Sequence, residues 1–152
     1  MSRFLPLVIA ACCAFAAPAP VTGAPPVYGW LESAYLQPWG IRVRAKLDTG
    51  ALTSSIHAEH IIPFERDGEP WVRFTLPVGE EEGYEGGVVV ERAIMREARI
   101  KDHDDTAMRR YVVRIAVCLD GHSVTTPMTL ADRSNFNYPL LLGQRTLRGR
   151  AL

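Results

Sequence analysis

The sequence predicts an all-β domain that folds as a small barrel or a sandwich. From Val27 onward, short runs of alternating apolar and polar residues recur, separated by turn residues such as glycine, proline and aspartate. Over the same part, no stretch has the apolar spacing of a helix of ordinary length. The 152 residues fit one domain, and a composition of 47% hydrophobic and 22% charged residues is that of an ordinary globular protein.

Each predicted strand is bounded by turn signals. The pair Asp120-Gly121 lies between two alternating runs and is a strong hairpin signal. The apolar run before Gly143 does not alternate, which is typical of a fully buried strand, and a brief helix is predicted after it. In chain order, the strands are predicted at Gly29–Leu36, Ile41–Leu47, Trp71–Leu76, Val88–Val90, Ala93–Ile100, Tyr111–Leu119, Ser123–Leu130 and Leu140–Leu142, and the helix at Gln144–Arg148.

Residues 1–24 are predicted to be a signal peptide and residues 25–152 the folded domain. A basic start ending at Arg3 precedes an apolar segment, Phe4–Ala17, that is too short to span a bilayer and has the size of a signal-peptide core. Ala14-Phe15-Ala16 offers a cleavage signal. Alternatively, Ile9-Ala10-Ala11-Cys12 resembles a lipoprotein box, and the protein would then touch the membrane only through a lipid on Cys12. Either form is exported, to the periplasm or the medium.

Charge and cysteine content exclude several classes of function. The 17 basic and 17 acidic residues cancel, which leaves no basic field for nucleic acid. Of three cysteines, only Cys118 lies outside the first 24 residues, so the mature domain forms no internal disulfide and no thiolate zinc site. Because Cys118 lies in an alternating apolar strand, we expect a buried, inert thiol.

The sharpest chemical feature is Leu47-Asp48-Thr49-Gly50-Ala51 at the end of a predicted strand. Gly50 permits a tight turn, which would present the Asp48 carboxylate at the end of a rigid strand while the Thr49 hydroxyl braces the loop. Asp, Thr and Gly are also ordinary turn residues, so the same letters are compatible with a plain turn.

A second feature narrows the interpretation. Leu140-Leu141-Leu142-Gly143 places large apolar residues directly before a glycine near the end of the chain. An Asp-Thr-Gly-Ala turn after an apolar strand, followed by apolar-apolar-Gly, resembles one half of an aspartic peptidase of the retropepsin type. The resemblance implies a small closed or partly open barrel with one short C-terminal helix. It also implies that the strand ending at Leu142 and Gly143 runs beside the Asp48 loop.

The chain is similar to one bacterial family over nearly all of its predicted mature length. Members of this family are often labelled ATP-dependent zinc proteases and are now grouped with retropepsin-like aspartic peptidases. One member trims glutamate tails that an ATP-grasp ligase adds to a ribosomal protein. The matching segments are Gly29-Trp30, Ala45–Ala51, Thr53–Ala58, Asp67-Gly68, Trp71–Phe74, Asp132-Arg133-Ser134 and Tyr138–Gly143.

The chain departs from the family pattern at two positions. The family usually has arginine where this chain has Leu52, and arginine directly after the glycine, where this chain has Gln144 followed by Arg145. If those arginines bind acidic substrates or stabilise a dimer in the family, this chain differs in substrate preference. The catalytic pattern itself is kept, because Asp48 and Gly143 are present.

The resemblance implies a peptidase mechanism that needs two copies of the chain. Two carboxylates in contact share one proton, so one activates a water molecule and the other polarises the scissile carbonyl. This chain has one Asp-Thr-Gly, so a two-fold homodimer must supply the second Asp48. The glycine-rich segment Gly79–Gly87, including Gly86 and Gly87, is either the flap that closes over substrate beside Ala51 or a solvated turn.

The residues give weaker support to other functions. There is no His-Glu-x-x-His zinc motif and no phosphate-binding loop, and we expect neither metal nor cofactor. His57 and His60 would share a face only if a short helix formed there. Our prediction is an exported homodimeric aspartic peptidase that hydrolyses peptide or amide bonds. The resemblance implies that its substrates are glutamate-rich peptides or peptides made by a ligase. The alternative is a non-catalytic periplasmic module that binds peptides or proteins on the same fold.

Overall fold

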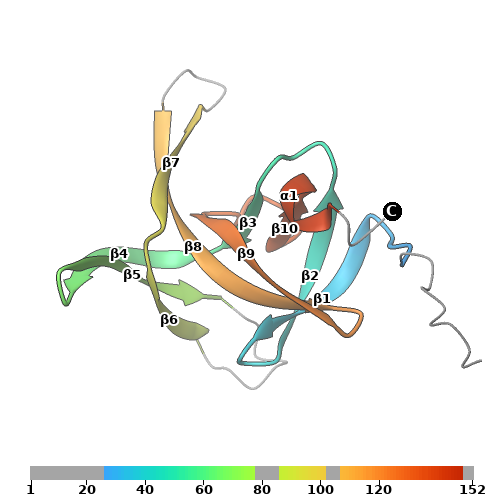
Figure 1. Cartoon of the computed structure of the whole chain (residues 1–152), viewed down its shortest axis with the longest axis horizontal. Helices are drawn as coiled ribbons and strands as arrows, with labels where there is room; N and C mark the ends of the chain where they lie inside the picture. The colour runs from blue at the N-terminus through green and yellow to red at the C-terminus, as the bar shows by residue number, and fades with distance from the viewer. Residues whose placement is uncertain (1–25, 78–85, 102–106, 149–152) are drawn as a thin grey trace, which may run out of the picture.

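The computed structural model of the chain describes residues 26–77, 86–101 and 107–148 (Figure 1). The predicted signal peptide lies outside these residues. The described part contains strands β1 (Leu31–Gln37), β2 (Ile41–Asp48), β3 (Ser54–His57), β4 (Glu59–Arg66), β5 (Glu69–Leu76), β6 (Val88–Ala93), β7 (Arg96–Lys101), β8 (Ala107–Leu119), β9 (His122–Ala131) and β10 (Leu140–Gly143), and helix α1 (Gln144–Leu147).

Six strands close into a mixed barrel in the order β1-β2-β10-β3-β9-β8, with β8 pairing back to β1. Most neighbours are antiparallel, but β10 runs parallel to β2 and β3 runs parallel to β9. Strand β7 extends the sheet beyond β8. The predicted closed barrel with one short C-terminal helix is therefore confirmed. The β8–β9 hairpin is also confirmed, with Asp120 and Gly121 both at positive φ.

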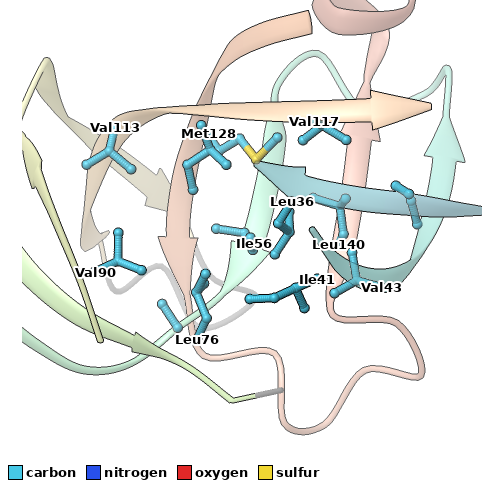
Figure 2. Close-up of a cluster of buried hydrophobic side chains, with 14 of the residues drawn as sticks. Leu36, Ile41, Val43, Ile56, Leu76, Val90, Val113, Val117, Met128 and Leu140 are labelled. Atoms are coloured by element: carbon cyan, nitrogen blue, oxygen red, sulfur yellow. The ribbon is translucent and has the colours of Figure 1, made fainter. Parts of the chain in front are cut away.

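A second sheet of three antiparallel strands, β4-β5-β6, packs on the barrel. Its inner side chains, such as Leu76 and Val90, join the same buried cluster as Leu36, Ile56 and Leu140 from the barrel strands, as Figure 2 shows. Alternation decides which side chains enter this core. In β2, Ile41 and the residues two and four positions later are buried, while the intervening arginines are exposed.

The sequence analysis missed β3 and β4. Strand β3 has only four residues, and the first three are buried, so it shows no alternation. Strand β4 is interrupted by a register shift between Glu59 and Ile62, and its exposed polar residues hide the pattern. The predicted run Ala93–Ile100 is in fact divided between the end of β6 and strand β7, which lie in different sheets.

The expectation that Cys118 is buried was wrong. The thiol is free, but it is half-buried rather than buried. Val117 and Leu119 take the inward positions of β8, so period-two alternation turns Cys118 to the outer face. No helix in the described part of the chain is long and apolar enough to cross a membrane.

Candidate active site

Asp48 is the last residue of β2, and the turn that follows holds its carboxylate. The Asp48 Oδ1 atom accepts hydrogen bonds from the backbone N–H groups of Gly50 (3.0 Å) and Ala51 (3.2 Å). The Thr49 side chain is exposed and makes no hydrogen bond to another described residue, so the predicted bracing by its hydroxyl is not formed within one chain. The turn therefore fixes one carboxylate oxygen and leaves the other for a different partner.

That partner is Lys46, a residue that the sequence analysis did not assign to the site. Its Nζ atom lies 3.0 Å from Asp48 Oδ2, and the two side chains are 42% and 25% exposed. The hydrogen bond from Lys46 lowers the pKa of Asp48, the backbone N–H groups of Gly50 and Ala51 lower it further, and partial burial opposes them. Residues two apart in a strand share a face, and that alternation could have identified Lys46.

Strand β10 backs the Asp48 turn. It runs parallel to β2 with Gly143 opposite Asp48, and buried Leu142 lies one residue earlier. The backbone N–H of Gln144 donates to the Ala51 carbonyl (2.7 Å), and the N–H of Arg145 donates to the Leu52 carbonyl (3.2 Å). The two positions that depart from the family pattern, 52 and 144, are exposed, and both take part through their backbones.

The close approach of β10 to the loop after Asp48 explains why residue 143 is a glycine. A Cβ atom on Gly143 would lie 2.6 Å from the carbonyl carbon and oxygen of Thr53 and 2.9 Å from the Ala51 carbonyl oxygen. Because these are backbone atoms, they cannot rotate away. Only glycine lets β10 approach the loop this closely.

A buried hydroxyl network lies under the turn and was also missed. Ser54 Oγ accepts a hydrogen bond from the Gly143 N–H (3.0 Å) and is 2.7 Å from Thr146 Oγ1, which is 2.7 Å from Thr126 Oγ1. The network ties α1 to β3 and β9. Its members are far apart in sequence, so no local pattern could have revealed it.

The structure does not bring Gly86 and Gly87 to Asp48. In Figure 1 the end of β5 and the start of β6 lie at the opposite end of the barrel from the turn that follows β2. The guanidinium of Arg92 in β6 lies 5.1 Å from the ring centroid of Trp39, which precedes the start of β2. Residues 79–85 of the predicted flap lie outside the described residues. Strands β7 and β8 instead project from the end that carries the turn (Figure 1).

His57 and His60 do not lie on one helical face. His57 and His60 lie in β3 and β4, so the helical face that would unite them does not exist. His57 Nδ1 accepts a hydrogen bond from the Arg133 backbone N–H (2.8 Å). Among the described residues, no three His, Cys, Asp or Glu side chains gather as metal ligands would.

A second cationic side chain, Arg133, lies two strands away from Lys46 across the sheet. Lys46, Leu141 and Ser55 are cross-strand neighbours. The Arg133 side chain, only 8% exposed, covers Ser55 by donating from Nη1 to Ser55 Oγ (2.8 Å), and donates from Nε to the Tyr138 carbonyl (3.1 Å). Among the described residues, Arg133 has no carboxylate partner. Burial lowers its pKa, and the charge of Arg110 adds to the effect.

Comparison with known proteins agrees with this site. A family described as "RimB-like: Retropepsin-like aspartic endopeptidase RimB" matches residues 27–152. Two relatives named "Probable alpha-L-glutamate ligase" are 35% identical over 111 residues (Shewanella halifaxensis) and 32% identical over 113 residues (Parasynechococcus marenigrum). Each alignment covers 72% of this chain, but the chain spans only about a quarter of the length of these relatives.

A solved structure has a similar fold. The crystal structure of Lpg0085 from Legionella pneumophila, a DUF785 protein of unknown function, superposes with a TM-score of 0.66 at 33% identity, covering 80% of this chain and 85% of that one. The family match extends over the whole described barrel and includes the Asp48 turn. The chain belongs to the RimB-like family of retropepsin-like aspartic endopeptidases.

Proposed function

We propose that the active enzyme is a two-fold homodimer in which the Asp48 carboxylates of the two chains activate one water molecule. The main support for the proposal is the turn that follows β2. Two backbone N–H groups of this turn bind Asp48 Oδ1, and β10 pairs with β2 beside it. One chain supplies one such carboxylate. Hydrolysis by this chemistry needs a second one as proton donor, and a symmetry axis beside the turn provides it.

The reaction follows from the shared proton. The ionised Asp48 takes a proton from water as the oxygen attacks the scissile carbonyl carbon, and the protonated Asp48 of the partner subunit donates to the carbonyl oxygen. The C–N bond then breaks as the Asp48 that took the proton from water gives it to the leaving amine. The partner's Asp48 takes back a proton from the hydroxyl of the tetrahedral intermediate, which leaves a carboxylic acid and restores the shared proton. Lys46 lowers the pKa of Asp48 in the single chain and so favours its ionised form, whereas a second carboxylate in contact favours one shared proton.

Exposed apolar side chains near the turn support the dimer. Leu52 is 52% exposed within the loop, and Trp30 is 64% exposed. The Trp30 carbonyl accepts the backbone N–H of Leu47, so the Trp30 backbone lies beside the end of β2, and its ring makes an edge contact with the Tyr138 ring (5.8 Å between centroids). Large apolar groups left in water next to a candidate catalytic turn are typical of a surface that a partner covers.

We further propose that the substrate is a glutamate-rich peptide. Lys46 lies beside Asp48, and Arg133 is buried without a carboxylate partner among the described residues. Such charges favour an acidic substrate. The relatives named as glutamate ligases act, by that name, on glutamate. A peptidase of the same family would cut what such a ligase makes.

The test uses a fluorogenic hexaglutamate peptide with wild type, Asp48→Asn and the control Asp132→Asn. Asp132 is an exposed carboxylate whose Oδ1 accepts the Ser134 N–H, a bond that asparagine can also accept. We expect Asp48→Asn to lose about 100-fold or more in kcat while sedimentation still shows a dimer. Full activity in Asp48→Asn, or in a monomer, would refute the mechanism. Tight binding of the peptide without hydrolysis by wild type would favour the alternative, a binding module.

We also propose that residues 1–24 export the protein. Sequencing the N-terminus of protein from the periplasm tests this: a start after residue 16 or 24 supports a signal peptide, and a lipid on Cys12 supports a lipoprotein. Retention of Met1 in the cytoplasm would exclude both.

A further inference from the structure

A small cavity lies beside the Asp48 loop, and the proposed reaction does not use it. Its volume is about 100 Å³, enough to hold several water molecules. Thr53 and Ser54 reach it from the end of the loop, Arg145 and Thr146 from α1, and Arg96 from β7. Asp48 does not line it. The cavity therefore adjoins the catalytic turn without containing the reacting group.

The polar groups at the base of the cavity are already satisfied. Thr146 Oγ1 lies 2.7 Å from both Ser54 Oγ and Thr126 Oγ1, and Ser54 Oγ also accepts the Gly143 N–H. These hydroxyls form a chain, Ser54–Thr146–Thr126, in which each one has at least one hydrogen-bond partner within the protein. Selectivity in the cavity must come from other groups.

Those groups are two guanidiniums. Arg96 and Arg145 are both exposed, and within the described part of the chain neither pairs with a carboxylate. They come from elements far apart in sequence, yet they line the same small cavity. Met95, Val112 and Pro127 give the cavity apolar surface, and Arg96 and Arg145 are the charged residues among the described ones that line it. Guanidinium forks bind carboxylates with geometric precision, so an acidic side chain is the ligand that these two residues favour.

We propose that this cavity is a subsite for one acidic side chain of the substrate, gripped by Arg96 and Arg145. The inference rests on the proposed peptidase function and adds to it. Because Thr53 lines the cavity and Asp48 does not, the cavity holds a substrate side chain and not the bond that is hydrolysed. Arg145 then has a role in place of the family arginine that is absent at position 144.

The test measures kcat and KM for hexaglutamate and for six peptides that each carry one Glu→Gln change. Wild type is compared with Arg96→Gln and Arg145→Gln. The controls are Arg99→Gln, an exposed arginine on the same strand as Arg96, and Arg148→Gln, an exposed arginine directly after α1. Neither control arginine lines the cavity.

We expect one peptide position at which Gln raises the wild-type KM about 10-fold, the effect of losing a charge-assisted hydrogen bond, with kcat little changed. In Arg96→Gln and Arg145→Gln, the KM for hexaglutamate rises by a similar factor and the penalty for Gln at that position disappears. The control variants keep both values. An equal effect of all six Gln peptides in every variant, or an equal loss in the controls, would overturn the subsite.

Binding to Asp48→Asn separates this inference from the proposed function. Titration calorimetry of hexaglutamate and its Gln variants into Asp48→Asn, with and without Arg96→Gln, needs no turnover. If hydrolysis fails but the position-specific difference in Kd remains, the subsite stands and the peptidase proposal falls. If hydrolysis requires Asp48 but Arg96→Gln leaves every Kd unchanged, the subsite falls alone.

Discussion

Replacing Gly143 with alanine tests how closely β10 packs on the catalytic turn. The added Cβ would lie 2.6 Å from the Thr53 carbonyl carbon and oxygen, well inside van der Waals contact. Gly143 has φ −89°, which any residue adopts, so the cost is steric rather than conformational. Overpacking against backbone costs about 1–3 kcal/mol. Because the colliding loop carries Asp48, we expect a destabilised protein whose turnover falls together with its stability.

The measurement is urea unfolding followed by tryptophan fluorescence at one fixed protomer concentration. We expect Gly143→Ala to lower the free energy of unfolding by about 2 kcal/mol. The control is Gly29→Ala. Its Cβ would lie 3.2 Å from the end of the flexible Glu32 side chain, and the nearest backbone atom is 3.7 Å away. That change should stay within about 0.5 kcal/mol. Equal, small effects of both substitutions would refute the close packing of β10 on the turn.

Three further predictions concern the same site. Ser54→Ala leaves the buried Gly143 N–H without its acceptor and should cost about 1–3 kcal/mol in the same urea assay; a loss under about 0.5 kcal/mol would contradict the network. Lys46→Met removes the main cause of the lowered Asp48 pKa, so the pH-activity profile should move to higher pH, whereas Lys46→Arg should keep it; an unchanged profile in Lys46→Met would contradict this role. Because the folded pKa of Asp48 is lowered, its ionised form adds stability above the ordinary value of 3.8, and this is lost as pH falls through the folded pKa. The stability advantage of wild type over Asp48→Asn should therefore shrink from about pH 5 to about pH 2, and an advantage that grows on acidification would refute the sign.

Several parts of the site could be predicted because they are local in sequence. The Asp48 turn follows from a strand ending in Asp-Thr-Gly, and the apolar run before Gly143 predicts a buried strand. The Asp120-Gly121 hairpin follows from the positive φ that its two residues tolerate. Lys46 was also within reach, because residues two apart in a strand share one face.

The remaining features depend on contacts between distant segments, which only the tertiary structure decides. The parallel pairing of β10 with β2 brings Gly143 against Asp48, and Ser54 bonds to Thr146 from 92 positions away. The cavity exists only because the fold brings Arg96 of β7 and Arg145 of α1 to one space with Thr53 and Ser54. By itself, the sequence determined which residues could carry the chemistry, since turn and strand preferences are local. Barrel closure decided which of them meet, because strand register sets the neighbours of each side chain.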